Sequence, residues 1–429
     1  MTATLNPSIM KSIEQLDYQV TVGDVAAQAG LEINLAQQGL LVLASEAGGH
    51  LQVADSGEMV FLFPKNYRTI LRNKYWRLRL QETWEKIWKV LFYLIRISFG
   101  IVLIASIILM MVAIAAILIA VNSGKESNNS SNDSGGGFFF IPTDIFWIFT
   151  TGDRYDSYEH SGRKSRQVKG QLNFLEAVFS FLFGDGNPNS NLDEKRWQEI
   201  GSVIRNYGGA VTAEQIAPYL DNITPLNQET EDYILPVLAR FNGYPQVSPE
   251  GDIIYYFPEL QVMAKQRRTN TVSQYLQEKL WRFSQAESSQ IILSIGLGGV
   301  YIILALVLGS LFRQYVVDIA LVSFVQFLYP ALLAYGIGFL AIPLIRYFWI
   351  QAKNKRIEAR NQQRQARANQ ITHPNQTLRQ KLQFARQFAN QTVITEADIA
   401  YSTDQDLLEQ EANRSDKIDQ EWQKHLDSK

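Results

Sequence analysis

Three long apolar stretches constrain this chain more than any other feature of its sequence. They cover residues 90–121, 291–312 and 319–350, and the charged residues within them are Arg96 and Arg346. A helix needs about 20 apolar residues to cross the hydrocarbon core of a bilayer, and soluble helices are rarely apolar on all sides for so long. We therefore predict an α-helical integral membrane protein with about three spans. Glycines inside the last two stretches are expected at close helix contacts: Gly296, Gly298, Gly299, Gly336 and Gly338.

A second constraint is an internal repeat. Residues 57–64 (GEMVFLFP) and 251–258 (GDIIYYFP) match position for position, and similar helix-capping patterns precede both at similar distances. In each copy, three helical patterns are followed by two short strand patterns that meet at a turn glycine. This order is typical of a winged helix. The sequence therefore predicts two winged-helix-like α+β modules, at 1–64 and 191–260.

The rest of the chain is assigned from composition and charge. A stretch rich in Asn, Ser and Gly is expected to be a flexible linker. Basic residues flank all three spans, which favours placing these flanks on the cytoplasmic or stromal side, with 138–183 re-entrant or interfacial. The predicted segments are a basic juxtamembrane helix at 65–89, spans at 90–121, 291–312 and 319–350, a flexible linker at 122–137, an aromatic interfacial or re-entrant region at 138–190, a juxtamembrane helix at 261–290, and a polar helical tail at 351–429.

The chain has no cysteine and four scattered histidines. This excludes disulfides, thiolate-ligated clusters and a thiol nucleophile, and it argues against a histidine metal site. Residues 185–193 space side-chain oxygens as a calcium loop does, but Ser190 and Arg196 replace the glycine and glutamate that such a loop needs. A turn and a helix cap account for the same residues. We predict no catalytic site, no metal, no cofactor and no enzyme activity, and no small-molecule substrate is evident.

Both modules are strongly acidic, and this charge bears on what they bind. Residues 12–64 carry seven acids and no Lys or Arg, and residues 197–260 carry nine acids against Arg205 and Arg240. Affinity for nucleic acid comes largely from neutralising phosphates, so the charge favours modules that bind protein. The candidate surfaces are the third helices and the wings. The predicted contact residues are Gln37, Gln38, Glu229, Glu231, Asp232 and Tyr233.

A distinctive run carries a resemblance to a known family. It consists of FLEAVFSFLFGDGNPN at 174–189, Arg196-Trp197, and TAEQIAPYL at 212–220. This run resembles a family of uncharacterised membrane proteins of cyanobacteria and plant chloroplasts, whose plant members carry a label that links them to iron–sulfur cluster biosynthesis. The resemblance is strongest over about residues 170–260. It implies a photosynthetic setting, with the thylakoid or plasma membrane, or a plastid equivalent, as the location.

The favoured hypothesis is a non-enzymatic scaffold or assembly factor that binds proteins, such as subunits of photosynthetic complexes. One alternative is a membrane-tethered regulator that binds nucleic acid through the basic helices beside the wings. Another is a small channel or carrier. The spans offer few polar residues for a transport path, chiefly Gln326, Tyr335 and some serines, so this alternative ranks last.

Overall fold

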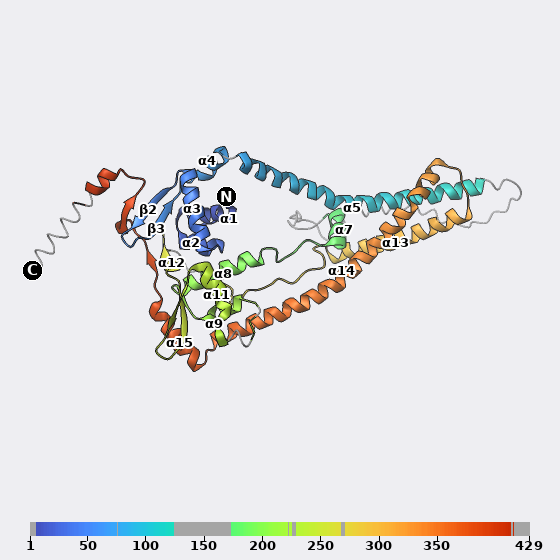
Figure 1. Ribbon diagram of the computed structural model, residues 1–429. Coiled ribbons are helices and arrows are strands. Elements are labelled where there is room, and N and C mark those ends of the chain that lie inside the picture. The colour runs from blue at the N-terminus through green and yellow to red at the C-terminus, as the bar shows by residue number, and fades with distance from the viewer. Residues whose placement is uncertain are drawn as a thin grey trace, which may run out of the picture. The chain divides into compact units, whose positions relative to one another are not determined.

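The computed structural model describes residues 6–74, 76–123, 173–221, 223–224, 229–266, 271–412 and 415. The chain divides into two compact units (Figure 1). Unit 1 comprises Met1–Glu82, Asn189–Lys279 and Arg356–Lys429, and unit 2 comprises Thr83–Pro188 and Leu280–Lys355. Each unit gathers segments that lie far apart in the sequence.

The two sequence repeats fold into two modules, both in unit 1, with the same order of elements. Module 1 consists of α1 (Pro7–Gln15), β1 (Gln19–Thr21), α2 (Val22–Ala29), α3 (Ile33–Ala47), β2 (His50–Ala54) and β3 (Met59–Leu62). Module 2 consists of α8 (Leu192–Asn206), β4 (Ala210–Val211), α9 (Ala213–Ile216), η1 (Ala217–Tyr219), η2 (Asp232–Ile234), α11 (Leu235–Phe241), β5 (Tyr244–Val247) and β6 (Ile253–Tyr256). The antiparallel strand order is β1-β3-β2 in the first and β4-β6-β5 in the second.

The turn of each hairpin is the same, which explains the repeated glycine. Gly57 donates its N–H to the carbonyl of Ala54 (2.8 Å), and Gly251 donates to that of Ser248 (3.0 Å). Both glycines have positive φ, 86° and 91°. A side chain disfavours this left-handed conformation, so both turns require glycine at this position.

Part of the C-terminal tail is built into unit 1. The strand β9 (Ile399–Ser402) pairs antiparallel with β2 and extends the first sheet to β1-β3-β2-β9. The helix α15 (Gln376–Phe388) packs against β4 and β6. The prediction of a polar helical tail at 351–429 is therefore wrong over residues 392–402, which also hold β8 (Thr392–Val393), paired in parallel with β7 (Val262–Met263), and η3 (Glu396–Asp398).

The outer strand edges of the two modules differ at two equivalent positions. In module 1 the N–H groups of Leu51 and Asp55 donate to the tail, each at 2.8 Å. Pro245 and Pro249 stand at these places in module 2 and have no N–H to donate. The proline edge cannot receive the tail strand in the same way. Prolines at such positions also protect an exposed strand from unwanted pairing.

The predicted juxtamembrane helix at 261–290 is wrong. A short helix, α12 (Pro258–Gln261), ends at the start of this range, and the described residues between β7 and Ser288 are not helical. Backbone groups outside regular structure need other partners, and amide side chains supply them here as a neighbouring strand would. Each of three asparagines accepts from the N–H and donates to the carbonyl of one residue at 2.7–3.0 Å: Asn189 with Lys279, Asn361 with Glu278, and Asn354 with Trp281.

Unit 2 is built from helices. The predicted basic helix at 65–89 forms α4 (Tyr67–Lys74), which belongs to unit 1, and the start of α5 (Trp76–Ser123). The other helices of unit 2 are α7 (Phe174–Phe183), α13 (Ser288–Gln314) and the first part of α14 (Ala320–Thr372), whose residues from Arg356 onward belong to unit 1. Within the described residues, three helical stretches are long and apolar enough to cross a membrane: Lys86–Asn122, Ser288–Gln314 and Ala320–Thr372. They coincide with the three predicted spans.

Two of the span glycines lie at close contacts. A Cβ on Gly298 would come within 2.8 Å of the Phe339 ring, and one on Gly336 within 2.7 Å of the Tyr301 ring. The prediction of close packing is confirmed at these two positions. It is wrong for Gly296, which has no neighbouring atom within 4 Å of such a Cβ. The same holds for Gly299, and a Cβ on Gly338 would make an ordinary contact.

A polar cluster joins the elements at one end of unit 2. Asp185, just after α7, accepts from Arg96 of α5 (2.8 Å), from the Ser180 hydroxyl (2.5 Å) and from the N–H of Gln285 (2.8 Å). Arg346 of α14 donates to the carbonyl of Ser180 (3.2 Å). The beginning of the first apolar stretch, the segment before the second and the end of the third therefore meet at α7.

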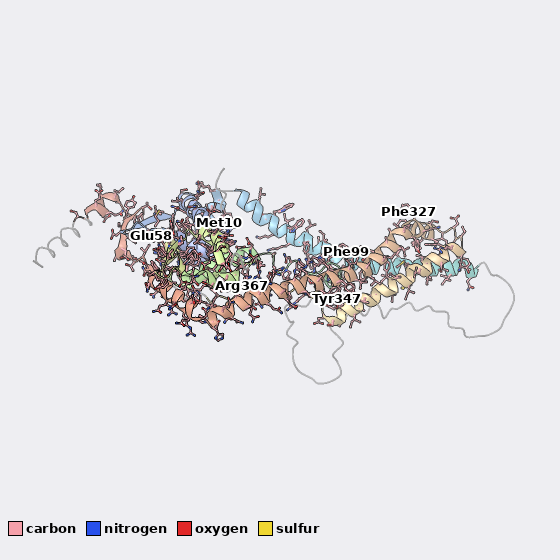
Figure 2. All side chains as sticks on the ribbon, turned by 60° about the horizontal axis from the view of Figure 1, so that its bottom comes forward. Met10, Glu58, Phe99, Phe327, Tyr347 and Arg367 are labelled. Carbon is pink, nitrogen blue, oxygen red and sulfur yellow. The ribbon has the colours of Figure 1, made fainter. Side chains whose placement is uncertain are left out.

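Aromatic rings add to this contact, with Phe99 4.9 Å from Phe183 between ring centroids; Figure 2 labels Phe99. The earlier part of the predicted interfacial or re-entrant region, 138–172, lies outside the described residues, as does most of the linker at 122–137.

Candidate functional site

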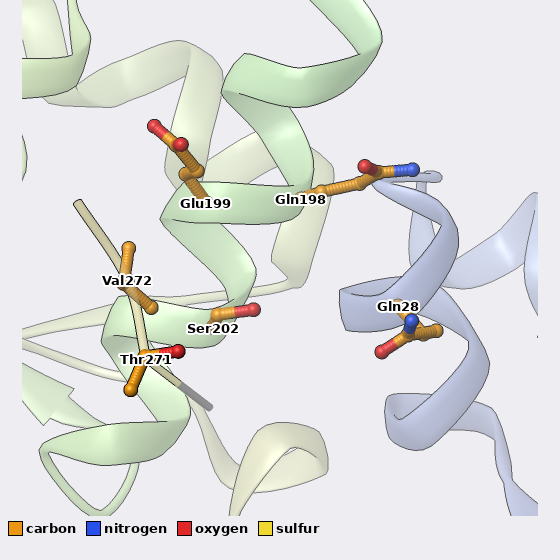
Figure 3. A pocket seen from close by; sticks show the side chains of 6 residues that line it. All are labelled: Gln28, Gln198, Glu199, Ser202, Thr271 and Val272. Carbon is orange, nitrogen blue, oxygen red and sulfur yellow. The ribbon is translucent and has the colours of Figure 1, made fainter. Parts of the chain in front are cut away.

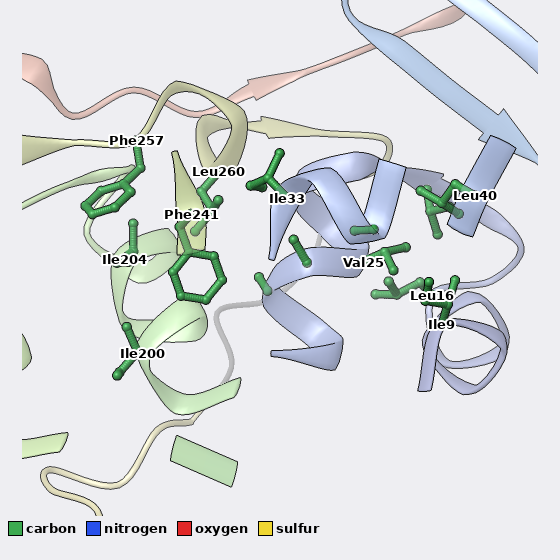
Figure 4. Packing of buried hydrophobic residues seen from close by; sticks show 14 of the residues in the cluster. Ile9, Leu16, Val25, Ile33, Leu40, Ile200, Ile204, Phe241, Phe257 and Leu260 are labelled. Atoms are coloured by element: carbon green, nitrogen blue, oxygen red, sulfur yellow. The ribbon is translucent and has the colours of Figure 1, made fainter. Parts of the chain in front are cut away.

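The two modules share one hydrophobic core. Side chains from both contribute to it, among them Ile33 of module 1 and Phe241 of module 2 (Figure 4). Helices α2 and α8 lie in direct backbone contact, because a Cβ on Gly201 would come within 2.8 Å of the Cα of Ala27. The modules are thus one packed body. A binding site for a partner would therefore lie on their outer surfaces, because the described residues of the modules do not form two mobile domains with a cleft between them.

A buried ion pair joins the modules through this core. Asp24 is fully buried and completes the capping box of α2, since it accepts from the N–H of Thr21 (3.0 Å) while Thr21 caps the helix. Its carboxylate also accepts from Arg205 of α8 (2.5 Å) and from the N–H of Ala264 (3.1 Å). A buried carboxylate needs such a set of partners, because loss of hydration is costly for an ion.

A second arginine of module 2 also faces module 1. Arg240 donates to the carbonyl of Gly30 (2.9 Å), and its guanidinium lies 4.2 Å from the ring centroid of Trp197. Burial is the main cause that lowers the pKa of Arg240. Arg205 and Arg240 are the cations of residues 197–260, and both are used in internal contacts. Neither is available to pair with the phosphates of a nucleic acid.

A buried lysine attaches the tail to module 2. Lys381 of α15 lies between Glu214 (3.0 Å) and Glu231 (2.5 Å), and the Tyr255 hydroxyl donates to the second oxygen of Glu231 (2.7 Å). Burial alone would lower the pKa of Lys381, but the two carboxylates outweigh it and raise the pKa. The lysine therefore stays charged, and two of the acids of module 2 are neutralised internally.

A second ionic cluster attaches α14 to module 2. Arg364 is 1% exposed and donates to Asp221 (2.5 Å), Glu278 (2.8 Å) and the carbonyl of Leu276 (2.9 Å). Arg360 binds both oxygens of Glu278 (2.8 and 2.7 Å). Burial would raise the pKa of Glu278, but its bonds to these two arginines hold the pKa below its usual range. Basic residues that the sequence assigns to a membrane flank thus serve as structural partners.

The structure separates the six predicted contact residues into two groups. Gln38 is exposed and Gln37 half-buried on α3, and Glu229 and Asp232 are exposed beside α11. Glu231 is held by Lys381 and Tyr255. Tyr233 is half-buried against the shared core. The residues of the second group contribute to the fold of module 2, which leaves the first four as surface candidates.

Apolar side chains extend these candidate surfaces. On α3, Leu35 and Leu41 are 53% and 44% exposed, and on the strand β5, Tyr244 and Val247 are 49% and 63% exposed. None of these four residues is among the predicted contact residues, although they lie on elements that the sequence predicts as contact surfaces. Large exposed apolar residues beside polar ones are typical of protein contact surfaces.

A small polar cavity lies between α2 and α8 (Figure 3). Its volume is about 290 Å³, and the residues that line it are Gln28, Gln198, Glu199, Ser202, Thr271 and Val272. Burial raises the pKa of Glu199, and contact with Lys195 opposes this shift. One carboxylate among amides and hydroxyls can form hydrogen bonds, but no nucleophile paired with a base is evident in this lining.

The described parts of both units offer no cluster of metal ligands. No group of three or more His, Asp or Glu side chains there is placed to hold a metal ion. The acids of the predicted calcium-like loop are used otherwise, since Asp185 accepts from Arg96 and Asp193 from Arg196 (3.0 Å). These acids therefore form ion pairs with arginines and do not form a metal site.

Comparison with known proteins finds a relative that aligns over most of this chain. The chain is 39% identical over 421 residues to an Arabidopsis thaliana protein described as "Uncharacterized protein At5g03900, chloroplastic". The alignment covers 94% of this chain and 79% of that protein. No family model matches the chain, and no solved structure matches it.

The ion pair between the modules can be tested by removing one partner. Replacing Arg205 by Ala leaves the buried carboxylate of Asp24 without its cation, so we expect a loss of about 3–5 kcal/mol in the free energy of unfolding. Urea denaturation of the purified protein measures this. The double variant Asp24→Asn, Arg205→Ala should recover part of the loss. As a control, Lys195→Ala on the same helix should cost at most about 1 kcal/mol, because its ion pair is partly solvated. Equal losses in both single variants would contradict a special role for Arg205.

The dependence of the free energy of unfolding on pH, below pH 5, tests the contribution of Glu278 to stability. Its pKa is lowered on folding from 4.5, so its contribution is complete above pH 4.5 and is lost as the pH falls through the folded value. The Glu278→Gln variant should be less stable than the wild type at pH 7 and should change less between pH 5 and pH 3. Urea midpoints across this range measure both effects. Glu409→Gln, at an exposed position of the tail, should follow the wild-type profile.

Proposed function

The chain belongs to the family of the chloroplastic Arabidopsis protein, and from this premise we propose that it is a multi-pass membrane protein of a photosynthetic membrane. The three apolar helices supply the anchor, in a thylakoid or plasma membrane of a cyanobacterium or the equivalent plastid membrane. The plastid address of the relative supports this location. We propose that the protein acts there as a non-enzymatic scaffold or assembly factor.

In this proposal the two modules are winged helices that bind proteins. The element order of each module and the pairing of its hairpin with the short strand β1 or β4 support this assignment. The third helix and the wing are the usual contact elements of such a module. Here they carry exposed apolar side chains, including Leu35, Leu41 and Val247.

The internal contacts of the arginines are the main reason to propose a protein and not a nucleic acid as the binding partner. Arg205 and Arg240 lie in contacts between the modules, and module 1 has no Lys or Arg over residues 12–64. A winged helix that binds DNA needs cations at the third helix and wing to neutralise phosphates. The exposed acids Glu229 and Asp232 would repel phosphates instead. They suit a partner protein with basic side chains.

The proposed membrane arrangement places both modules on one side of the bilayer. The modules and the docked part of the tail share unit 1, and a common core cannot be divided by a membrane. The polar cluster at α7 supports the same arrangement, because it gathers the ends of the apolar stretches from which the modules and tail depart. The basic residues at these ends favour the cytoplasmic or stromal side.

Single cysteines test this arrangement, since the wild-type chain has none. Gln38→Cys, Asp232→Cys and Gln405→Cys should react with a membrane-impermeant maleimide from the same side of sealed vesicles. Val316→Cys, between α13 and α14, is fully exposed and should react from the opposite side. Each residue is measured in right-side-out and inside-out vesicles. Labelling of Gln38→Cys and Asp232→Cys from opposite sides would overturn the arrangement.

Affinity purification from native membranes tests the proposed binding of proteins. The tagged protein should retain a stoichiometric partner protein after nuclease treatment. Glu229→Lys combined with Asp232→Lys should reduce recovery of this partner about tenfold or more, because like charges across an interface are unfavourable. Glu231 is left unchanged, since its loss would disturb the bond to Lys381.

The matched control reverses two exposed acids of the tail, Glu409→Lys with Glu411→Lys, and should retain the partner. Recovery that is lost on nuclease treatment would instead favour the membrane-tethered nucleic-acid regulator. Equal recovery from both charge-reversed variants would exclude the surface beside α11 as the contact.

A further inference from the structure

A small pocket in unit 1 lies beside the ionic cluster of α14. Its volume is about 80 Å³, and its lining consists of Asp221, Ile223, Arg360, Gln363, Arg364 and Arg367. This volume corresponds to two or three water molecules in the liquid. The pocket is much too small for a nucleotide or a pigment but has room for an ion of about five heavy atoms.

The charges around the pocket do not balance. Four guanidinium groups meet here, and two buried or half-buried carboxylates, Asp221 and Glu278, serve three of them: Arg196, Arg360 and Arg364. The further acid Asp193 contacts Arg196, but its side chain is 77% exposed, so water screens its charge. The cluster therefore carries an excess of positive charge in a partly desolvated place.

Arg367 carries this excess. Its Nη1 donates to the carbonyls of Leu220 (3.0 Å) and Ala217 (3.4 Å), and no carboxylate among the described residues pairs with it. Burial is the main cause that lowers the pKa of Arg367; the charge of Asp221 opposes this shift, and the charge of Arg364 adds to it. The seven residues that follow Asp221, 222–228, contain no acid that could supply the missing charge. Figure 2 labels Arg367 on α14.

Hydrogen-bond donors remain for a ligand. Among the described residues, the contacts of Arg367 use Nη1, and those of Arg360 use Nε and Nη2, so these residues leave Nε and Nη2 of Arg367 and Nη1 of Arg360 without a partner. Gln363, which lines the pocket and is exposed, adds an amide. Planar guanidinium groups present N–H donors in the geometry that phosphate and carboxylate oxygens prefer.

We propose that this pocket binds a phosphate group, held by Arg367, Arg360 and Gln363. Arg364 and its carboxylates form the rigid floor and take no direct part. A tetrahedral oxyanion fits the volume, supplies the missing negative charge and accepts several hydrogen bonds at once. The pocket opens at Arg360 and Gln363, so the phosphate could be free inorganic phosphate or the headgroup of a phosphate monoester lipid.

Equilibrium dialysis of the purified full-length protein with radiolabelled inorganic phosphate, at constant ionic strength in chloride, tests the proposal. We expect saturable binding of about one phosphate per chain. Arg367→Gln should weaken binding at least tenfold. Gln363→Glu places a carboxylate in the pocket and should weaken binding similarly, while the thermal midpoint without phosphate stays the same or rises because the new acid neutralises the cluster.

The matched control is Gln362→Glu, which adds the same charge at the neighbouring exposed residue outside the pocket lining. It should bind phosphate as the wild type does. Loss of binding in this control to the same degree as in Gln363→Glu would overturn the proposal, because it would show a general effect of charge. Absence of saturable binding by the wild type would overturn it directly.

Two further readouts complete the test. Phosphate at tenfold excess over the wild-type Kd should raise the thermal midpoint of the wild type by about 1.5 °C, and that of Gln363→Glu by no more than about a third as much. Competition with dihexanoyl phosphatidic acid below its critical micelle concentration separates the two sources. Displacement of the labelled phosphate would support the pocket as a site open to a lipid headgroup, and retention would support a site for free phosphate.

Discussion

The contact between Asp24 and Arg205 is the interaction on which the organisation of unit 1 depends. A single carboxylate completes the cap of α2, receives the N–H of Ala264 and neutralises a cation from the other module. Because a buried charge is tolerated only with its partners in place, this set favours one relative position of three segments over all others. Sliding α8 along α2 by a helical turn would break this ion pair and would move Gly201 out of its close contact with Ala27.

The sequence predicted the elements whose causes are local. Repeated turn glycines specify both hairpins, capping residues begin the helices, and length with apolar composition identifies the spans. The ionic partners could not be predicted in this way, since Asp24 and Arg205 are 181 residues apart. The wrong helix at 261–290 has the same origin. The backbone groups of this segment bond to asparagine amides up to 90 residues away in the sequence, and the local pattern does not predict these partners.

The candidate site was predictable to a similar extent. Pattern and charge led to Gln38, Glu229 and Asp232, which the structure shows to be exposed. Net charge was a poorer guide, because the tail supplies cations that neutralise acids of module 2. Glu231 is one such acid, and its bond to Lys381 connects residues 150 apart. The sequence does contain a signal for this bond, because Lys381 lies on the buried face of the amphipathic helix α15. A lysine on such a face needs acidic partners.

The pairing of β9 with β2 has a consequence for biosynthesis. Leu51 and its partner Thr403 are separated by 352 residues, and ribosomes add roughly 5–20 residues per second, so the outer edge of the first sheet waits about 20–70 s for its last strand. During this time all three apolar helices emerge. An uncovered strand edge is a template for pairing with other chains. The nascent protein thus passes through a vulnerable interval, which the prolines of the second hairpin avoid and which a chaperone or the membrane insertion machinery would have to cover for the first.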